Sequence, residues 1–299
     1  MAKNEEFVII GASYEKPLCT IQKDSIWQRL RDKPLISIIV FVSILSVCIF
    51  AEQIMNHDPA NFYLQHLNEA PNSEFYFGTD ALGRDIFSII WYGGRVSIFI
   101  GLLGTAILTS IGVIYGCISG TASAIIDNLM MRLAEILSSV PTFLLMLLIL
   151  SVLGRPTVIS IAVVIGITSW MSLARIVRSE VRQIQSSEYI LSARSMGASF
   201  LRILMKHLIP NFMSAIMFIV VSSVSQCIMM ESTLSFFGLG LPVSVISWGS
   251  MLSLSDKALL TNSWWVILIP GGFVVITLLC ITNIGHYLRG KANRKASNL

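Results

Sequence analysis

Long apolar runs alternate with polar connections along most of the chain. Six of these runs come close to the roughly 20 residues that a helix needs to cross a bilayer. Backbone N–H and C=O groups in hydrocarbon must pair internally, and a helix does this within one segment. The pattern therefore predicts an all-α, polytopic membrane helix bundle of six transmembrane helices. They are expected at 34–50, 96–119, 133–153, 158–173, 212–230 and 264–285.

Two apolar stretches need a separate interpretation. Residues 234–254 are apolar but interrupted by three glycines and Pro242, which favours a re-entrant or interfacial segment over a crossing. The first run follows more than thirty polar and mixed residues and ends in a poor cleavage site. A signal peptide has a shorter leader, so we expect an uncleaved first helix.

The composition agrees with a membrane protein. Of the 299 residues, 54% are hydrophobic and only 13% are charged, whereas about a quarter of a soluble domain is charged. The mean hydropathy is +0.74. The five cysteines show no CxxC spacing, and four lie in or beside apolar runs, so we expect buried free thiols.

Lysine and arginine gather in three segments, which sets the orientation. Residues 1–33 and 174–210 hold six each and the tail 286–299 holds four, whereas 55–94 holds only Arg84. With six spans, all three basic segments fall on one side. The predicted organisation is a cytoplasmic segment 1–33, a first transmembrane helix 34–54, an external loop 55–94, a helical core 95–285 with a cytoplasmic loop 174–210, and a cytoplasmic tail 286–299.

The 174–210 loop is too long for a simple connector. It predicts a helix–Gly–helix hairpin: a short helix at 188–196 ends at Gly197, a second helix follows, and Pro210 marks the boundary before the fifth crossing. Two interpretations are open from the residues alone. The hairpin is either a basic amphipathic element resting on anionic lipid or a docking surface for a cytoplasmic partner.

The same loop resembles the EAA loop of ATP-binding-cassette importer permeases. Ala193, Gly197 and Pro210 match that pattern in spacing, while Leu191, Ser192 and His207 depart from it. In the family, this loop forms the coupling helices that dock on the ATPase subunit. The resemblance implies an ATPase-coupling role for Tyr189, Ser192, Ala193, Gly197 and Pro210.

The external loop narrows the resemblance. Residues 77–85, with 94–97, are similar to the signature of the oligopeptide/dipeptide/nickel permease family, C-subunit type. Thr79 or Asp80 is suited to cap a helix, and Asp80 lies four residues before Arg84. We interpret this signature as structural: Gly78, Thr79, Asp80, Gly83, Arg84 and Asp85. Further matches at 231–242, 247–249 and 264–289 extend the resemblance over about 75–290.

The resemblance implies a type I ABC importer permease of the MetI-like fold in a bacterial cytoplasmic membrane, with both termini cytoplasmic. Implied partners are a homologous permease subunit, two cytoplasmic ABC ATPases, an extracytoplasmic binding protein and the lipid bilayer, with no nucleic acid. ATP hydrolysis is expected on the ATPase subunits. The chain itself is expected to be no enzyme and to hold no cofactor or metal. Di- or oligopeptides are the first expected cargo, with nickel or a metal chelate as the alternative.

A secondary transporter driven by an ion gradient is the alternative from a different class. It calls for inverted repeats and buried ionisable groups, neither of which is evident in the sequence.

Gln226 and Glu231 are the candidates for a transport pathway, because polar groups within membrane helices are costly. His57 and His66 match no compact metal site, and a near P-loop at 285–292 has Ala292 in place of the final Ser or Thr.

Overall fold

The computed structural model of this chain describes residues 34–203 and 209–296, most of which are helical. A single isolated bridge, between Thr79 and Asp85, is the only β pairing within these two ranges. This confirms the all-α prediction. The helices are α2 (Leu35–Ile49), α3 (Ala51–Ile54), α4 (Ile86–Thr121), α5 (Ala124–Ser139), α6 (Thr142–Leu153), α7 (Val158–Ser169), α8 (Met171–Gln185), α9 (Glu188–Ser195), α10 (Phe200–Ile203), α11 (Ile209–Phe236), α12 (Trp248–Leu252), α13 (Ser255–Leu260) and α14 (Trp265–Ala296).

Three of the described helices are long and apolar enough to cross a membrane by themselves: α4, α11 and α14. The pairs α5–α6 and α7–α8 also qualify if each bent pair counts as one span, which gives up to five. Helix α2 is apolar but only 15 residues long. Length and composition thus establish several membrane helices, and the count of six stays a prediction.

The third expected span is not one continuous helix. Helices α5 and α6 meet at an angle of 84°, with Val140 in an extended conformation between them. Pro141 explains the break, because proline lacks an N–H and disfavours helical dihedrals in the residue before it. Expecting an unbroken helix over 133–153 was therefore wrong.

Several helices extend beyond the apolar runs that predicted them. Helix α8 follows α7 after a 46° bend and continues to Gln185, inside the segment expected as a loop. Helix α4 begins at Ile86, within the expected external loop, and its 36 residues make it about 54 Å long at 1.5 Å per residue. Helix α14 continues to Ala296, past the expected end at 285.

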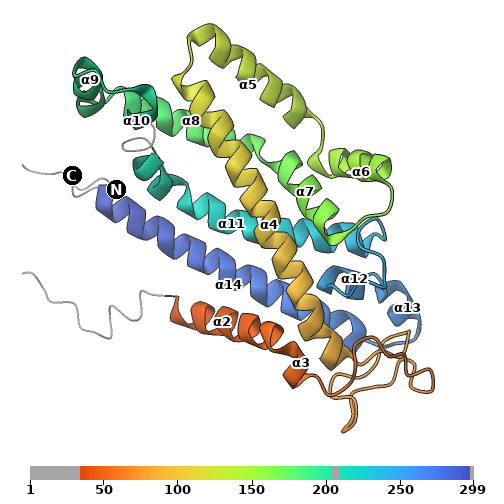
Figure 1. Ribbon diagram of the computed structural model, residues 1–299. Helices are drawn as coiled ribbons and strands as arrows, with labels where there is room; N and C mark the ends of the chain where they lie inside the picture. The colour runs from red at the N-terminus through yellow and green to blue at the C-terminus, as the bar shows by residue number, and fades with distance from the viewer. Residues whose placement is uncertain (1–33, 204–208, 297–299) are drawn as a thin grey trace, which may run out of the picture. The chain divides into compact units, whose positions relative to one another are not determined.

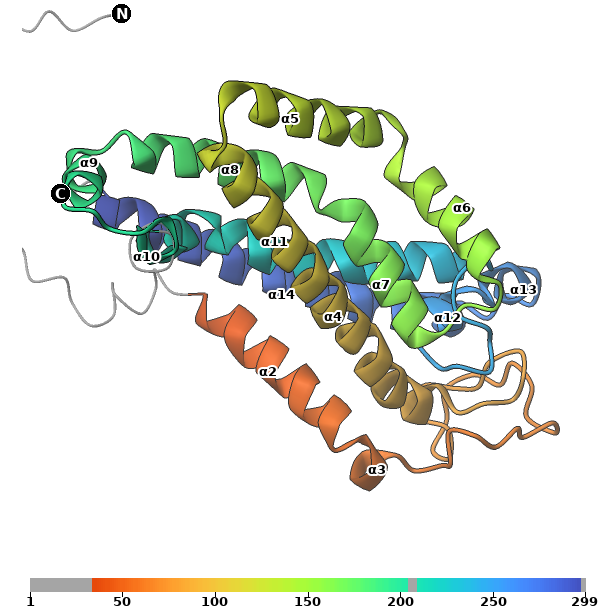
Figure 2. The ribbon, with the colours of Figure 1, turned by 45° about the horizontal axis from the view of Figure 1, so that its top comes forward.

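Helix α4 is the central packing element, in contact with α7, α8 and α11. The two ends of the bundle differ, and both ribbon views show the same grouping (Figures 1 and 2). Helices α9 and α10 lie at one end, with the C-terminal end of α14; we call this the α9 end. Helices α3, α12 and α13 lie at the other end with the 55–85 loop; we call this the α12 end. The four cysteines in the described ranges are buried and free, as predicted, while Cys19 lies outside those ranges.

Candidate coupling hairpin and polar networks

The first part of the hairpin, from α9 to Gly197, has the local geometry that its sequence predicts. Helix α9 ends at Ser195, and Gly197 has a φ of +76°, the left-handed region that glycine adopts without strain. The Ala198 N–H donates to the carbonyl of Ala193 at 3.0 Å, the bond that closes a Schellman motif. The expected stop at Gly197 is confirmed.

Helix α9 has a buried side and an exposed side. Ile190 is fully buried and Ala193 is 8% exposed, so both pack inside this chain. Ser192, Met196 and Gly197 are exposed, and Met196 keeps 80% of its surface accessible. Among the described residues, no atom outside the adjacent backbone lies within 4 Å of a Cβ atom added at Gly197. Glu188 at the start of the helix is exposed as well, so the described exposed residues combine small side chains, one carboxylate and one long apolar side chain.

Part of the predicted coupling loop cannot be placed. Lys206 and His207 lie outside the described ranges, and the side chains of Tyr189 and Pro210 are likewise not described. An ATPase-coupling role for Tyr189, Ser192, Ala193, Gly197 and Pro210 stays a prediction.

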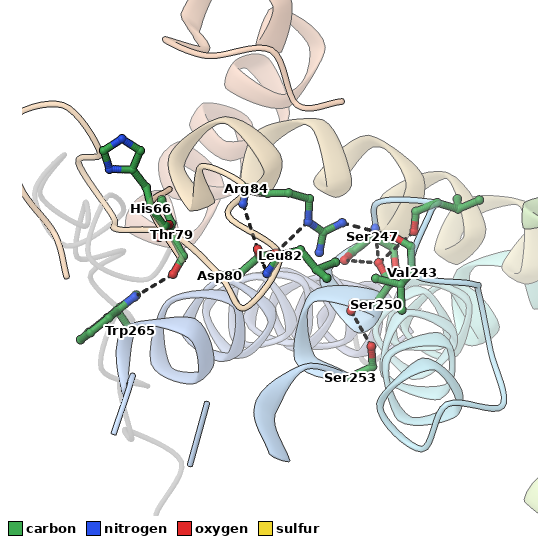
Figure 3. A network of polar contacts seen from close by, with 11 residues as sticks. His66, Thr79, Asp80, Leu82, Arg84, Val243, Ser247, Ser250, Ser253 and Trp265 are labelled. Atoms are coloured by element: carbon green, nitrogen blue, oxygen red, sulfur yellow. Dashed lines mark hydrogen bonds and ion pairs between the residues drawn. The ribbon is translucent and has the colours of Figure 1, made fainter. Parts of the chain in front are cut away.

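At the α12 end, a buried ion pair holds the signature turn (Figure 3). The Asp80 carboxylate accepts from Arg84 Nε at 2.7 Å and from the backbone N–H groups of Leu82 and Arg84 at 2.8 and 2.9 Å. Arg84 Nη1 donates to the carbonyl of Val243 at 3.2 Å. Asp80 and Arg84 are each 2% exposed. These contacts support the structural interpretation of the pair, because they join the turn to the segment before α12.

The helix cap in this turn differs from the prediction. Asp85, not Thr79 or Asp80, caps α4, since its carboxylate accepts from the N–H groups of Phe87 and Ser88. Thr79 instead bonds the loop: its Oγ1 accepts from the Glu69 N–H, and its carbonyl accepts from Trp265 Nε1 at 3.1 Å. Gly78 and Gly83 both have a φ of +74°, which reverses the chain ahead of the helix.

Glu231 is fully buried between α4, α11 and α12. Its carboxylate accepts from the hydroxyls of Ser97 and Ser235 at 3.0 Å and of Ser247 at 2.7 Å. Ser247 also caps α12 in a capping box with Ser250 (Figure 3). The Trp248 N–H donates to Ser97 at 3.1 Å, which closes the group of bonds that we call the Glu231 network.

Glu231 and Gln226 are not brought together on one surface. Gln226 is exposed, whereas Glu231 contributes no accessible surface in this conformation. A transport-pathway role for either residue stays a prediction. Sequence reasoning missed the partners of Glu231, because Ser97 and Ser247 lie 134 and 16 residues away from it.

A second ionic group, also missed from the sequence, lies beside the hairpin. Asp127 in the first turn of α5 is 1% exposed and contacts both Arg178 and Arg182 of α8 at 2.5 Å. Ser119 near the end of α4 donates to the same carboxylate at 2.5 Å. A signal was present: two arginines four residues apart lie on one helix face.

The sequence comparisons agree with this geometry. The family model described as "Binding-protein-dependent transport system inner membrane component" matches residues 112–294. The chain belongs to this family. The match begins within α4 and covers the bent pairs, the hairpin, α11, α12 and nearly all of α14.

Curated relatives match over most of their length. The oligopeptide transport system permease protein OppC of Bacillus subtilis (strain 168) is 38% identical over 91% of this chain and 90% of its own. The dipeptide transport system permease protein DppC of the same organism is 35% identical over 95% and 88%. OppC of Escherichia coli (strain K12) is 33% identical over 92% and 93%. This member of the family is therefore a multi-pass membrane permease component with a MetI-like fold.

Proposed function

We propose that this chain is one of two permease subunits of a peptide importer in a bacterial cytoplasmic membrane, driven by ATP hydrolysis on separate cytoplasmic subunits. One observation carries the proposal: a Gly-terminated helix, α9, presents an exposed side at one end of the bundle. Its position matches the coupling loop that the sequence resembles. An extracytoplasmic binding protein delivers the peptide at the α12 end, and the α9 end faces the cytoplasm with the basic segments.

The mechanism is a shift between two states of the bundle. ATP binding favours the closed ATPase pair, and α9 moves with the ATPase on which it is docked. Met196 supplies apolar contact area, and Gly197 allows close approach because no atom lies near its missing side chain. Ile190 and Ala193 fix α9 to the rest of this chain, so that docking force is passed inward.

Peptides are the proposed cargo because relatives matched over nearly their full length are named as oligopeptide and dipeptide permeases. The exposed side of α9 and the buried networks are compatible with any cargo of this transport class. Cargo selection is therefore assigned to the binding protein and to the pathway between the two permeases.

The test is ATP-dependent uptake of a labelled peptide by the whole complex in proteoliposomes. Wild type is expected to take up peptide only with ATP inside the compartment that the α9 end faces. Gly197→Asp is expected to abolish uptake while the subunit still inserts, because a charged side chain enters the docking surface. Uptake that continues without ATP under an imposed ion gradient would indicate the secondary-transporter alternative and contradict the proposal.

A further inference from the structure

Asp127 joins three helices at the α9 end. Its two carboxylate oxygens accept from Arg178 Nε and Nη2 and from Arg182 Nη2, all at 2.5 Å. Ser119 of α4 donates to the same group. The carboxylate is 1% exposed, whereas the side chains of Arg178 and Arg182 are 26% and 45% exposed. A buried carboxylate with two cationic partners and a hydroxyl is a strong, directional link between α5, α8 and the end of α4.

The same two helices, α4 and α8, pack without room for side chains at three glycines of α4. A Cβ at Gly116 would lie 2.6 Å from the Ala174 carbonyl and 2.7 Å from Val177 Cβ. At Gly120 it would lie 2.9 Å from Val181 Cγ1 and 3.1 Å from the Arg178 carbonyl, and at Gly112 it would lie 3.1 Å from Leu173. The contact therefore follows α8 up to the point where Asp127 binds it.

Helix α4 connects this contact to the opposite end of the bundle. It is one unbroken helix from Ile86 to Thr121, and it crosses between the two ends in both ribbon views (Figures 1 and 2). Ser97, near its other end, belongs to the Glu231 network that holds α12. A displacement of α8 that carries α4 with it would therefore reach α12.

From this arrangement we propose that Asp127 is a positioning residue for transport. It fixes α8 to the turn between α4 and α5. Because α8 leads directly into the coupling helix α9, a movement of the docked hairpin then displaces α4 as well. Without this contact, the same movement would only bend α8. This inference rests on the proposed function. Without the Asp127 contact, the ATPase would still hydrolyse ATP, but each hydrolysis cycle would displace the α12 end less.

The experiment compares Asp127→Asn with wild type in the complete importer, with its partner permease, ATPases and binding protein, in proteoliposomes. The measured quantity is labelled peptide taken up per ATP hydrolysed. Asparagine keeps the shape of the aspartate side chain and removes its negative charge. ATP hydrolysis is expected to stay close to the wild-type rate, while the ratio falls about fivefold or more. Asp127→Glu is expected to recover part of the ratio.

Two further variants show whether the effect runs through the arginines. Arg178→Gln is expected to lower the ratio. The double variant Asp127→Asn/Arg178→Gln is expected to lower it no further than Asp127→Asn alone, because that single change already removes the ionic contact with Arg178. The matched control is Glu135→Gln on the same helix. Glu135 is 52% exposed and pairs with Arg132, itself 80% exposed, so this change is expected to leave the ratio unaltered.

An unchanged ratio in Asp127→Asn, with both activities lowered in proportion to the amount of complex, would overturn the inference and leave Asp127 as a fold-stabilising group only. If Asp127→Asn does not assemble, Arg182→Gln replaces it as the test, since it leaves Asp127 paired with Arg178. The inference then requires the peptide taken up per ATP hydrolysed to be lower in Arg182→Gln than in wild type. Failure of the wild-type complex to take up peptide with ATP would instead reject the proposed function.

Discussion

The polar networks at the α12 end and the coupling helix α9 differ in how far the rest of the chain covers their side chains. At the α12 end, Asp80, Arg84 and Glu231 are at most 2% exposed and bond to other segments of the chain. At the α9 end, Ser192 of the coupling helix and Met196 and Gly197 just after it are exposed, and no atom of the described residues surrounds the position of a Cβ at Gly197. The α12 end is thus braced internally, whereas α9 offers a surface that this chain does not cover.

The difference indicates a division of work. A buried charge is tolerated only when it is paired or fully hydrogen-bonded, and it then holds its segments in one arrangement. The exposed side of a helix whose other side is packed can dock on a partner without breaking contacts inside its own chain. Large stability effects are therefore expected from changes in the α12-end networks, and small stability effects with large transport effects from changes at the exposed end of α9.

The largest stability loss is expected for Arg84→Ala. It leaves the Asp80 carboxylate buried without its cation and removes the bond to Val243, so unfolding should become easier by about 3 kcal/mol. The measurement is the thermal unfolding midpoint of the detergent-solubilised subunit. The control Arg132→Ala alters an exposed pair and should shift the midpoint little. Equal shifts in both variants would contradict the braced-end interpretation.

A smaller loss is expected for Glu231→Leu. Three serine hydroxyls, from Ser97, Ser235 and Ser247, lose their buried acceptor, at a cost of about 2 kcal/mol after they find other partners. Limited proteolysis should cut first between α11 and α12, because α12 loses its attachment. Gln226→Leu on the same helix is the control and should leave the cleavage pattern as in wild type.

Gly249→Ala tests the packing of the same network. The added Cβ would lie 2.8 Å from Glu231 Oε1 and from Ser232 Cα, so neighbouring atoms must shift at a cost of about 1–2 kcal/mol. The unfolding midpoint measures this cost. A midpoint equal to wild type would show that α12 is loosely held.

The smallest stability effect is expected for Gly197→Ala. The positive φ disfavours alanine by about 1 kcal/mol, but nothing obstructs the methyl group, so only the end of α9 should fray. The global unfolding midpoint should be unchanged while amide exchange at 196–198 accelerates. A global loss as large as that of Arg84→Ala would contradict the contrast between the two ends.

The sequence predicts the all-α character and the end of α9 because both depend on local signals. Apolar runs give the helices, and Gly197 gives the end of α9. The bend at Pro141 was also readable, since proline acts on its immediate neighbours. Local signals are ambiguous where several residues could cap the same helix. Thr79, Asp80 and Asp85 are all of residue types that favour the N-cap position. The turn made by Gly78 and Gly83 places Asp85 at the start of α4.

Long-range partners are not encoded in local patterns. Asp127 resembles an ordinary acidic residue in the first turn of a helix, and Arg178 and Arg182 resemble loop charges that set orientation. Their contact spans 51 and 55 residues and depends on the packing of α8 against the glycines of α4. Glu231 stands out in the sequence as an acid at the end of an apolar run, but its serine partners come from three different helices or their caps.

The central claim is that α9 faces the cytoplasm and docks on a separate ATPase. The most direct test places a single cysteine at Met196→Cys, with the native cysteines replaced, and measures labelling by a membrane-impermeant maleimide. Labelling is expected from the cytoplasmic side only, with protection when the ATPase subunits are bound. Labelling from the external side, or equal labelling with and without bound ATPase, would contradict it.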